Sequence, residues 1–328
     1  MRAAVVQNPG KPEALELREV PMPKPRSGWV LIRVMAFGLN RSEMFTRQGH
    51  SGSAVTFPRI LGIECVGVVE EAPDSPLKPG QKVAALMGGM GRAYDGSYAE
   101  YTLVPATQVI PVATDLPWET FAAIPETFLT AWGSLVASLN VRKGNTLLIR
   151  GGTSSVGMAA ATIAKNLGAT VIATTRSAAK KQALIANGAD HVVIDNGRIS
   201  DAVREIFPTG VTHVLELIGV ATLLDSLKTA ARQGVVCNTG ILGNAWVLKE
   251  FEPMAAIPSS VRLTTFLSDT VDASTSTAEL QKVLDATSEG SYRVKPNRVF
   301  RLDEIVEAHR YMESNQPTGK IVVNVEPR

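Results

Sequence analysis

Residues 145–158 read NTLLIRGGTSSVGM, and this stretch decides the fold of the chain. A short apolar run, 147–149, ends at two glycines, and an alanine-rich segment with a helical repeat of apolar residues follows as far as Leu167. A Gly-Ala pair then ends the predicted helix before a second apolar run, 170–175. The order strand, tight turn, helix, strand predicts a βαβ unit whose helix begins at the carboxyl edge of a parallel sheet.

The tight turn after the first strand is suited to holding a phosphate. Gly151 and Gly152 allow a sharp bend, and Gly157 lets the helix pack close to the strand. In the G-x-G-x-x-G pattern, Gly152 and Gly157 match the first and third glycines, whereas Ser154 stands at the second. The position between a strand and a helix favours a dinucleotide site over a purely structural turn. The expected contacts are Gly152, Thr153, Ser154, Ser155 and Val156.

The end of the second strand indicates which dinucleotide binds. Enzymes that use NAD carry an Asp or Glu about 20 residues after the glycines, which accepts hydrogen bonds from the ribose 2′-OH. Here the chain reads Thr174-Thr175-Arg176-Ser177, with Lys180 one helical turn further on. Cations and hydroxyls suit a 2′-phosphate, and an Arg–phosphate hydrogen bond is worth about 1.5–3 kcal/mol. We therefore predict NADPH over NADH. The alternative is that Arg176 and Lys180 are solvated residues at a helix start.

Bulk properties exclude several classes of protein. The 328 residues suffice for two domains, and 33 basic against 31 acidic side chains leave a formal charge of +2. This balance predicts neither nucleic acid nor an anionic membrane as a partner. We find no signal-peptide pattern and no apolar run of about 18 residues. Cys65 and Cys237 lie in apolar runs, so we expect buried free thiols in a cytoplasmic protein.

The organisation changes along the chain. Residues 1 to about 120 predict an irregular, mostly antiparallel β-domain with proline-rich turns. Its expected strands are 3–7, 15–20, 29–37, 62–71, 82–86 and 97–104. A helical pattern covers 117–139, and from Asn145 strands and helices alternate, which predicts a doubly wound parallel sheet. Its further strands are 192–195, 211–218, 235–239 and 262–267. The tail, with helices near 277–288 and 303–314 and a strand at 320–325, is expected to return to the first domain.

This order of parts resembles the medium-chain dehydrogenase/reductase superfamily, and several runs resemble its zinc-free quinone oxidoreductase branch, the zeta-crystallin-like enzymes. The runs are GLNRSE (38–43), FPRILGIECVGVV (57–69), DGSYAEY (95–101), TFLTAW (127–132) and GKIV (319–322). The resemblance implies an α/β protein with a GroES-like, β-rich catalytic domain and a Rossmann domain. The predicted boundaries are 1–123 with 267–328 for the former and 124–266 for the latter.

The same comparison disfavours zinc. Alcohol dehydrogenases of this superfamily bind it through an early Cys, a Gly-His-Glu triplet and a later Cys or Asp. In this chain the triplet reads Gly62-Ile63-Glu64, the early segment 38–43 has no thiol, and the short loop 87–92 replaces the four-cysteine lobe. A catalytic zinc needs three converging N, S or O ligands. We therefore expect no metal, and hydride donation to an acceptor that is already electrophilic.

The resemblance also implies residues of the site. Asn40 matches a family asparagine beside the nicotinamide and acceptor, whose amide can donate to a developing oxyanion. Thr130 matches a threonine that touches the nicotinamide amide, and Lys180 a lysine on the 2′-phosphate. An αL turn at Asn40 and a helix-interior hydroxyl at Thr130 are the alternatives. Further residues expected to bind the coenzyme are Thr175, Ser177, Gly240, Ile241, Leu242, Phe266, Leu267 and Lys320.

Two positions depart from the family pattern. Several relatives carry a tyrosine five residues after the asparagine, as a candidate proton donor, and here Phe45 stands there. A second family tyrosine, near the 2′-phosphate, corresponds to Asp195, whose charge either loosens that pocket or is offset by Arg176. Replacement donors are sought on loops of the β-domain. The candidates are His50, Arg41, Arg92 and Tyr94. His191, His213 and His309 have no metal-binding spacing and are expected to be structural.

These observations predict an NADPH-dependent reductase that transfers hydride to a quinone or to an α,β-unsaturated carbonyl, with a solvent proton completing the reaction. The alternative is a non-catalytic NADPH-binding protein, which Phe45 favours. A serine hydrolase is disfavoured because the run Gly152-Thr153-Ser154-Ser155-Val156 does not match G-x-S-x-G. The family implies a homodimer formed by edge strands of the cofactor domains. The apolar residues that could supply this edge are Ile241, Leu242, Trp246, Val247 and Leu248.

Overall fold

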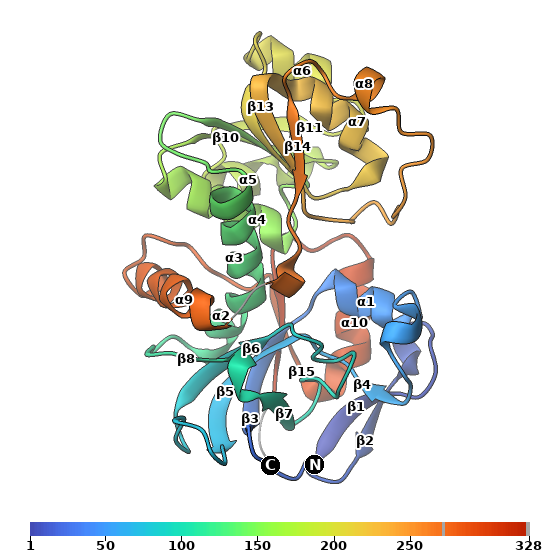
Figure 1. Ribbon diagram of the computed structural model, residues 1–328, viewed down its shortest axis with the longest axis vertical. Coiled ribbons are helices and arrows are strands. Elements are labelled where there is room, and N and C mark those ends of the chain that lie inside the picture. The colour runs from blue at the N-terminus through green and yellow to red at the C-terminus, as the bar shows by residue number, and fades with distance from the viewer. Residues whose placement is uncertain (271–272, 326–328) are drawn as a thin grey trace. The chain divides into compact units, whose positions relative to one another are not determined.

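A computed structural model describes residues 1–270 and 273–325 of the chain. The chain forms two compact units (Figure 1). Unit 1 comprises Met1–Leu129 and Ser268–Arg328, and unit 2 comprises Thr130–Leu267. Each unit has its own cluster of buried apolar side chains. The two parts of unit 1 are therefore separated in sequence by the whole of unit 2.

Unit 2 is built on a six-stranded parallel sheet with the order β11-β10-β9-β12-β13-β14. The strands are β9 (Thr146–Arg150), β10 (Thr170–Thr175), β11 (His191–Ile194), β12 (Val211–Glu216), β13 (Ala230–Asn238) and β14 (Arg262–Thr265). Because the chain runs outward from β9 to β11 and then returns to the other side at β12, the switch point lies between β9 and β12. Open α/β sheets bind their ligands beside the carboxyl ends of the strands at such a point.

Helices connect these parallel strands, as a parallel sheet requires. They are α4 (Ser155–Asn166), α5 (Lys181–Ala186), α6 (Ser200–Ile206) and α7 (Val220–Thr229), and a short α8 (Pro253–Ala256) precedes β14. Helix α4 packs against β9 and β10, where its small residues Ala160 and Ala164 are fully buried. Leu148, Ile172 and Val214 lie in one core with Leu227 of α7. The predicted doubly wound sheet is confirmed.

Unit 1 contains two β-sheets. A three-stranded sheet has the order β2-β1-β4, and a seven-stranded sheet runs β15-β16-β3-β5-β6-β8 with β7 also paired to β3. The strands are β1 (Arg2–Val6), β2 (Leu15–Glu19), β3 (Trp29–Gly38), β4 (Arg59–Ile60), β5 (Glu64–Glu71), β6 (Lys82–Leu86), β7 (Tyr101–Pro105), β8 (Val109–Pro111), β15 (Arg298–Arg301) and β16 (Ile321–Asn324). Among these named strands, every pair is antiparallel except β15 with β16.

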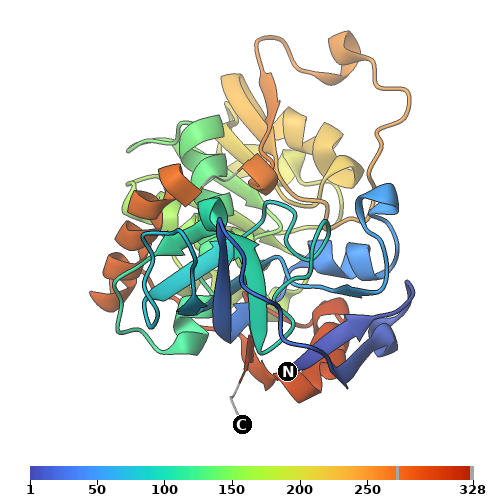
Figure 2. The ribbon, with the colours of Figure 1, turned by 60° about the horizontal axis from the view of Figure 1, so that its bottom comes forward.

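The tail of the chain completes the larger sheet of unit 1. Strand β16 pairs with the end of β3, where Val322 lies opposite Gly38. This pairing places Lys320 beside the loop that opens α1 (Arg41–Arg47). The other α-helices of the described part of this unit are α2 (Trp118–Ala122), the first part of α3 (Pro125–Trp132), α9 (Ala273–Ser288) and α10 (Ile305–Glu313). Helix α10 lies beside the β1–β2 connection (Figure 2).

Several element boundaries differ from the sequence prediction, for example that of β13, which begins at Ala230 instead of Val235, and two of the differences have a clear physical reason. The strand expected from Gly62 begins at Glu64, because Gly62 has a φ of +106° and turns the chain. The strand expected at 97–104 begins at Tyr101. Before it, the Ser97 hydroxyl donates to the carbonyl of Glu64, and Ala99 bridges to Ala3 of the smaller sheet. The segment 97–99 therefore joins the two sheets instead of extending one strand.

Candidate functional site

The turn between β9 and α4 in unit 2 is held by a local set of hydrogen bonds. Ser154 is the N-cap of α4, and its hydroxyl accepts from the Gly157 amide at 3.1 Å and donates to the Gly151 carbonyl at 2.8 Å. The Gly151 and Gly152 amides donate to the hydroxyl and carbonyl of Thr174 on β10, at 3.0 and 3.1 Å. These hydrogen bonds therefore hold the turn against strand β10 without a ligand.

Close backbone approach explains the glycines in this turn. A Cβ atom on Gly157 would lie 2.5 Å from the Gly151 oxygen, and one on Gly152 would lie 2.9 Å from Ala173 Cβ. Gly151 has a φ of +92°, which L side chains rarely adopt. Helix α4 has 12 residues, and its N-terminus carries partial positive charge at the carboxyl edge of the sheet. The turn is thus suited to a pyrophosphate.

Cations follow the end of β10. Arg176 is exposed, Ser177 and Lys180 are half-buried, and the Ser177 amide donates to the Thr175 hydroxyl at 3.2 Å. Burial lowers the pKa of Lys180, and the positive charge of Arg176 lowers it further. The positive charges of Arg176 and Lys180 therefore repel each other. An anion placed beside them would relieve the repulsion, so the pair suits a phosphate better than a ribose hydroxyl.

Behind the turn, Arg150 at the end of β9 forms a buried ionic network. Its guanidinium is 0% exposed, and it donates to both oxygens of Asp195 at 2.9 and 3.0 Å and to Asp225 at 2.8 Å. Asp195 was expected to loosen the phosphate pocket or to be offset by Arg176. The structure assigns the balancing charge to Arg150, whose position inside an apolar strand run was the signal for a buried partner.

Most of the other predicted coenzyme residues of unit 2 lie near the ends of the neighbouring strands, whereas Thr130 lies on α3. The Leu242 amide donates to the Leu217 carbonyl at 3.0 Å, which holds the segment after β13 against the end of β12. Phe266 packs so closely on Gly133 that a Cβ there would lie 2.1 Å from the ring. Thr130 is buried and its carbonyl accepts from Ser134, whereas Leu267 is exposed. The remaining members of this predicted set are Gly240 and Ile241, which lie in the same segment as Leu242.

In unit 1, Asn40 belongs to a buried cluster around Lys320. The Lys320 ammonium lies 2.6 Å from both Asn40 Oδ1 and Glu64 Oε1. Because an ammonium has only donors, it fixes the amide orientation and turns Asn40 Nδ2 toward Glu64 Oε1 at 3.0 Å and the Gly38 carbonyl at 3.4 Å. Burial lowers the pKa of Lys320, but Glu64 and Glu126 outweigh it and hold that pKa above its ordinary value.

The cluster is tightly enclosed. Glu126 Oε2 lies 3.8 Å from the Lys320 ammonium, and the Glu126 amide donates to Glu64 Oε2 at 3.0 Å. A Cβ atom at Gly38 would lie 2.1 Å from Lys320 Cε and 2.6 Å from Glu64 Oε1, so only glycine leaves room for the pair. Asn40 is 8% exposed and Lys320 is 4% exposed. Sequence reasoning named Asn40 and Lys320 separately and missed Glu64 and Glu126 as their partners.

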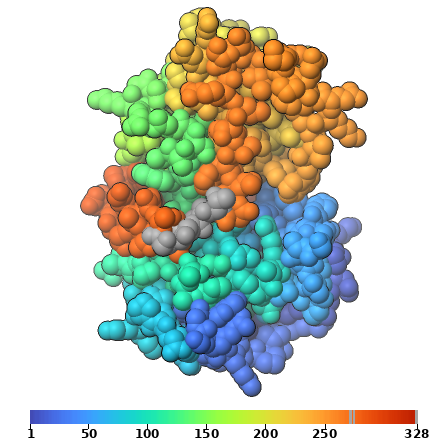
Figure 3. All heavy atoms as spheres, viewed as in Figure 1, coloured from blue at the N-terminus to red at the C-terminus, as the bar shows by residue number. Residues whose placement is uncertain are grey.

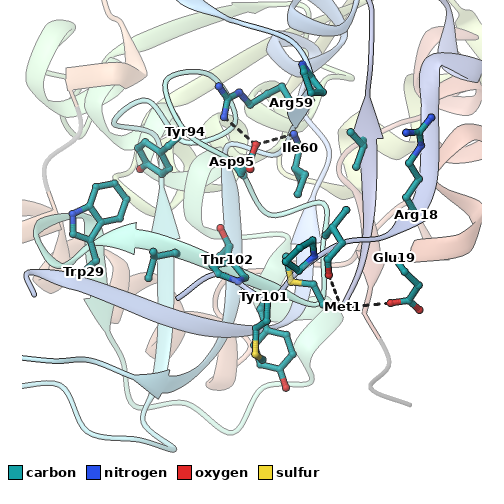
Figure 4. A pocket seen from close by; sticks show the side chains of 18 of the residues that line it. Met1, Arg18, Glu19, Trp29, Arg59, Ile60, Tyr94, Asp95, Tyr101 and Thr102 are labelled. Carbon is teal, nitrogen blue, oxygen red and sulfur yellow. Dashed lines mark hydrogen bonds and ion pairs between the residues drawn. The ribbon is translucent and has the colours of Figure 1, made fainter. Parts of the chain in front are cut away.

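The candidate replacement donors do not gather around this cluster. Tyr94 lies against Trp29 and donates to Gln108, and burial raises its pKa. Both rings line a cavity of about 660 Å³ whose rim includes the Arg59–Asp95 ion pair (Figure 4). The residues lining this cavity do not include Asn40, Glu64 or Lys320.

Of the other three candidates, His50 and Arg92 lie on loops as expected, whereas Arg41 is the first residue of α1. His50 is exposed and its ring centroid lies 5.9 Å from that of Phe45, which is itself packed in the core of unit 1. Arg41 donates to Asn315 at 2.7 Å, and Arg92 has a buried Nε that finds no hydrogen-bond partner among the described residues. Of the site residues predicted in unit 1, the structure therefore brings Asn40 and Lys320 together and leaves the others apart.

Metal-ligand clusters and membrane-spanning helices are both absent from residues 1–270 and 273–325. Among these residues, no group of three or more His, Cys, Asp or Glu side chains could hold a metal ion. No helix within them is long and apolar enough to cross a membrane.

Comparison with family models and curated proteins gives full-length similarity. A model described as an alcohol dehydrogenase GroES-like domain matches residues 26–114, and one described as a zinc-binding dehydrogenase matches residues 187–323. The quinone oxidoreductase of Mus musculus is 30% identical, with 74% of each chain covered. The acryloyl-coenzyme A reductase of Sulfurisphaera tokodaii is 26% identical over 98% of this chain and 99% of its own length. A phenolphthiocerol/phthiocerol polyketide synthase protein of Mycobacterium tuberculosis is 30% identical over 99% of this chain, which spans 15% of that protein.

Solved structures are similar over the whole chain. The structure titled AibC has a TM-score of 0.89 and 30% identity, covering 100% of this chain and 96% of that one. The mycobacterial protein Rv1454c, solved in complex with NADPH, has a TM-score of 0.88 and 26% identity, covering 99% of this chain and 100% of its own.

Proposed function

Because the chain belongs to the medium-chain dehydrogenase/reductase superfamily, in its quinone oxidoreductase-like branch, we propose that it is an NADPH-dependent reductase of quinones or α,β-unsaturated carbonyls. Membership of this family makes it an oxidoreductase that uses a nicotinamide coenzyme. The preference for NADPH and the class of acceptor are our proposal. The observation that carries it is the phosphate-binding turn followed by Arg176 and Lys180 in unit 2.

The coenzyme is held by backbone and side chains of unit 2. The amides at the start of α4 and the turn residues 152–156 would bind the pyrophosphate, as the close packing at Gly152 and Gly157 allows. Arg176, Ser177 and Lys180 would bind the 2′-phosphate, because their charges and hydroxyl complement a dianion. Asp195 does not oppose this binding, since both of its oxygens accept from Arg150. When bound, the coenzyme supplies the hydride.

The donor set of unit 1 does not fit zinc, although one matching family model is described as zinc-binding. In the Gly62-Ile63-Glu64 triplet, the middle side chain has no ligating atom, and Glu64 already accepts from a buried ammonium and from Asn40. Burial raises the pKa of the adjacent Cys65 thiol, so it stays protonated and is a poor ligand. The proposed hydride transfer therefore uses no metal.

The residues of unit 1 can stabilise the negative charge that an acceptor oxygen develops on hydride addition. Asn40 Nδ2 donates more weakly to Gly38, at 3.4 Å, than to Glu64, at 3.0 Å, so the hydrogen facing Gly38 is the one free to exchange to an acceptor. Lys320 keeps the amide in this orientation and contributes a fixed positive charge. Such preorganised donors act where charge appears in the transition state. A solvent proton then completes the reduction.

The test is NADPH consumption with purified protein against 1,4-benzoquinone, 9,10-phenanthrenequinone, an alkyl vinyl ketone and 2-alkenals, with NADH in parallel. We expect turnover of at least one acceptor and a higher kcat/KM with NADPH. The preferred acceptor decides between quinone and enone reduction. Tight NADPH binding without turnover of any acceptor would refute the reductase proposal and favour a non-catalytic NADPH-binding protein.

We also propose a homodimer formed through the free edge of the parallel sheet. Strand β14 is the last strand of that sheet, and the segment before it, orange in Figure 3, lies on the surface of unit 2. Val247 is 72% exposed and Met254 is 92% exposed in this segment. Pairing β14 with its counterpart would cover both the edge and these side chains. Sedimentation of the wild-type chain should give a dimer, and the V247E/M254E variant should sediment as a monomer.

A further inference from the structure

Glu43, in the first turn of α1, ties together the two segments that carry the partners of Lys320. Its Oε2 accepts from the backbone amide of Asn40 at 2.7 Å, and its Oε1 accepts from the backbone amide of Ile63 at 2.8 Å. Asn40 and Glu64, the residue after Ile63, are the side chains that bind the Lys320 ammonium at 2.6 Å. The Glu43 carboxylate therefore joins the two backbones at the cluster itself.

A chain of two further side chains orients this carboxylate. The Tyr98 hydroxyl donates to Glu43 Oε2 at 2.7 Å. Because the single hydroxyl proton of Tyr98 is donated to Glu43, the Tyr98 oxygen accepts a hydrogen bond from His309 Nε2, which lies 3.0 Å away. His309 is therefore neutral with its proton on Nε2, and its buried Nδ1 has no partner in the described part of the chain. Burial, and to a smaller extent Arg47, lower the pKa of His309 to about 3, so it stays neutral.

The surroundings of Glu43 are charged as well as apolar. Glu43 and Tyr98 are at most 1% exposed, and burial raises the pKa of Glu43 to about 7. The hydrogen bonds from Tyr98, Ile63 and Asn40 and the charge of Lys320 act in the opposite direction. The other ionisable groups around the carboxylate and its tyrosine are His309 from α10, Glu64 from β5 and Arg47 from α1 itself. Protonated Glu43 would present a hydrogen to donors on either oxygen, so one of these bonds would be lost.

We propose that Glu43 is a positioning residue of the reductase: its carboxylate form aligns Asn40 and Glu64 around Lys320 and so sets the rate of hydride transfer. This inference rests on the proposed function. Glu43 need not touch the acceptor or the coenzyme, because it acts through the backbones of Asn40 and Ile63. Small displacements of such groups are costly, since a shift of about 1 Å can lower a rate by about 100-fold.

The experiment compares wild type with E43Q, Y98F and the control E100Q, whose carboxylate pairs with Arg2 elsewhere in unit 1. Activity of the wild type should rise with pH through the titration of Glu43. E43Q should lower kcat by about 10- to 100-fold and lose this rise, with little change in the KM for NADPH. Y98F removes a hydrogen bond that lowers the pKa of Glu43, so the midpoint should move to higher pH. E100Q should behave like wild type.

A purely structural role would change stability without moving the midpoint. The proposal is overturned if E43Q keeps the wild-type kcat and pH profile, or if Y98F lowers activity at an unchanged midpoint. Backbone ¹⁵N–¹H spectra give a readout without turnover. The backbone amide chemical shifts of Asn40 and Ile63 should change together with pH near neutrality in wild type and should not do so in E43Q. If no acceptor is reduced but these amides titrate, the proposed function fails while the positional coupling stands; if they do not titrate, the coupling itself fails.

Discussion

Each unit of the molecule contains a buried cation that bonds to two carboxylates, and the two networks differ in what the cation does. In unit 1, Lys320 lies 2.6 Å from Glu64 and 3.8 Å from Glu126. In unit 2, Arg150 lies 2.9 Å from Asp195 and 2.8 Å from Asp225. Burial lowers the pKa of both cations, but the neighbouring carboxylates outweigh it and raise both pKa values. Both cations are therefore permanently charged.

The difference lies in geometry. Arg150 presents a planar fork that uses Nε and Nη2 on Asp195 and Nη1 on Asp225, Ser226 and a backbone carbonyl. All of these partners lie behind the turn between β9 and α4. Lys320 is a compact charge, and one of its two short bonds goes to Asn40, a candidate catalytic group. The arginine network therefore holds a fixed frame, whereas the lysine network orients the Asn40 side chain, for which we propose a role in the reaction.

The largest expected effect comes from K320M, which removes the cation that lies 2.6 Å from the buried Glu64 carboxylate. Removing one partner of a buried ion pair typically costs about 3–5 kcal/mol of unfolding free energy. We expect a loss of this size in urea denaturation followed by circular dichroism, together with loss of turnover. The double variant K320M/E64Q should regain part of the stability, because it removes the carboxylate nearest the ammonium, but should not regain turnover. Wild-type stability in K320M would mean that the pair is not a structural element.

The separation of contacting residues along the chain decides how much of the fold and of the site the sequence predicts. The turn between β9 and α4 is a local feature: the strand, the glycines, the N-cap and the start of the helix fall within residues 145–158, so their order predicted both the βαβ unit and the turn. The networks are not local. Asn40 and Lys320 are 280 residues apart, and Arg150 and Asp195 are 45 apart. Only the pairing of β16 with β3, and of β9 with its neighbours, brings such side chains together.

For the same reason, the sequence named Asn40 and Lys320 without their mutual contact, and it left open whether Asp195 loosens the pocket or is offset by Arg176, whereas its partner is Arg150. Glu43 was missed because an acid in the first turn of a helix is an ordinary capping residue. Its two additional bonds, to Ile63 and Tyr98, come from segments that the local pattern does not reveal.

Arg176 differs from the buried Arg150 in that it is exposed, and we propose that it binds the 2′-phosphate. R176A should weaken NADPH binding by about 10- to 100-fold, since an Arg–phosphate hydrogen bond contributes about 1.5–3 kcal/mol. NADH binding should change little, because NADH has no 2′-phosphate. The matched control is K181A, which removes an exposed cation beside Lys180. Titration of coenzyme fluorescence measures the affinity of wild type and of each variant for both coenzymes. Equal weakening of NADH and NADPH binding in R176A would show that Arg176 does not bind the 2′-phosphate.

A smaller effect is expected from D195N, which keeps the shape of the Arg150 partner and removes its charge. Burial alone would raise the pKa of Asp195, but hydrogen bonds from Arg150 and Gly197 outweigh it and hold that pKa below its ordinary value of 3.8. A carboxyl with a depressed folded-state pKa contributes stability above its unfolded pKa and loses it as the pH falls through the folded value.

We therefore expect D195N to lower the unfolding free energy by about 1–2 kcal/mol at pH 7. The difference from wild type should stay constant down to about pH 5 and shrink below about pH 4. Urea denaturation at several pH values measures it. A difference that grows on acidification would show that Asp195 is not ionised in the folded protein.

The smallest effect is expected from K165A, which removes a lysine–carboxylate ion pair that is exposed to solvent. Lys165 on α4 lies 2.5 Å from Asp190, about the distance that separates Lys320 from Glu64, but its side chain is 46% exposed. Water and salt screen such a pair, so its loss should cost less than about 1 kcal/mol. The Asp190 carboxylate keeps its hydrogen bond from the Val171 amide at 2.8 Å, so it is not left without a donor. If denaturation showed K165A to be as damaging as K320M, burial would not be what distinguishes the two ion pairs, and the contrast between a surface pair and the lysine network of unit 1 would fail.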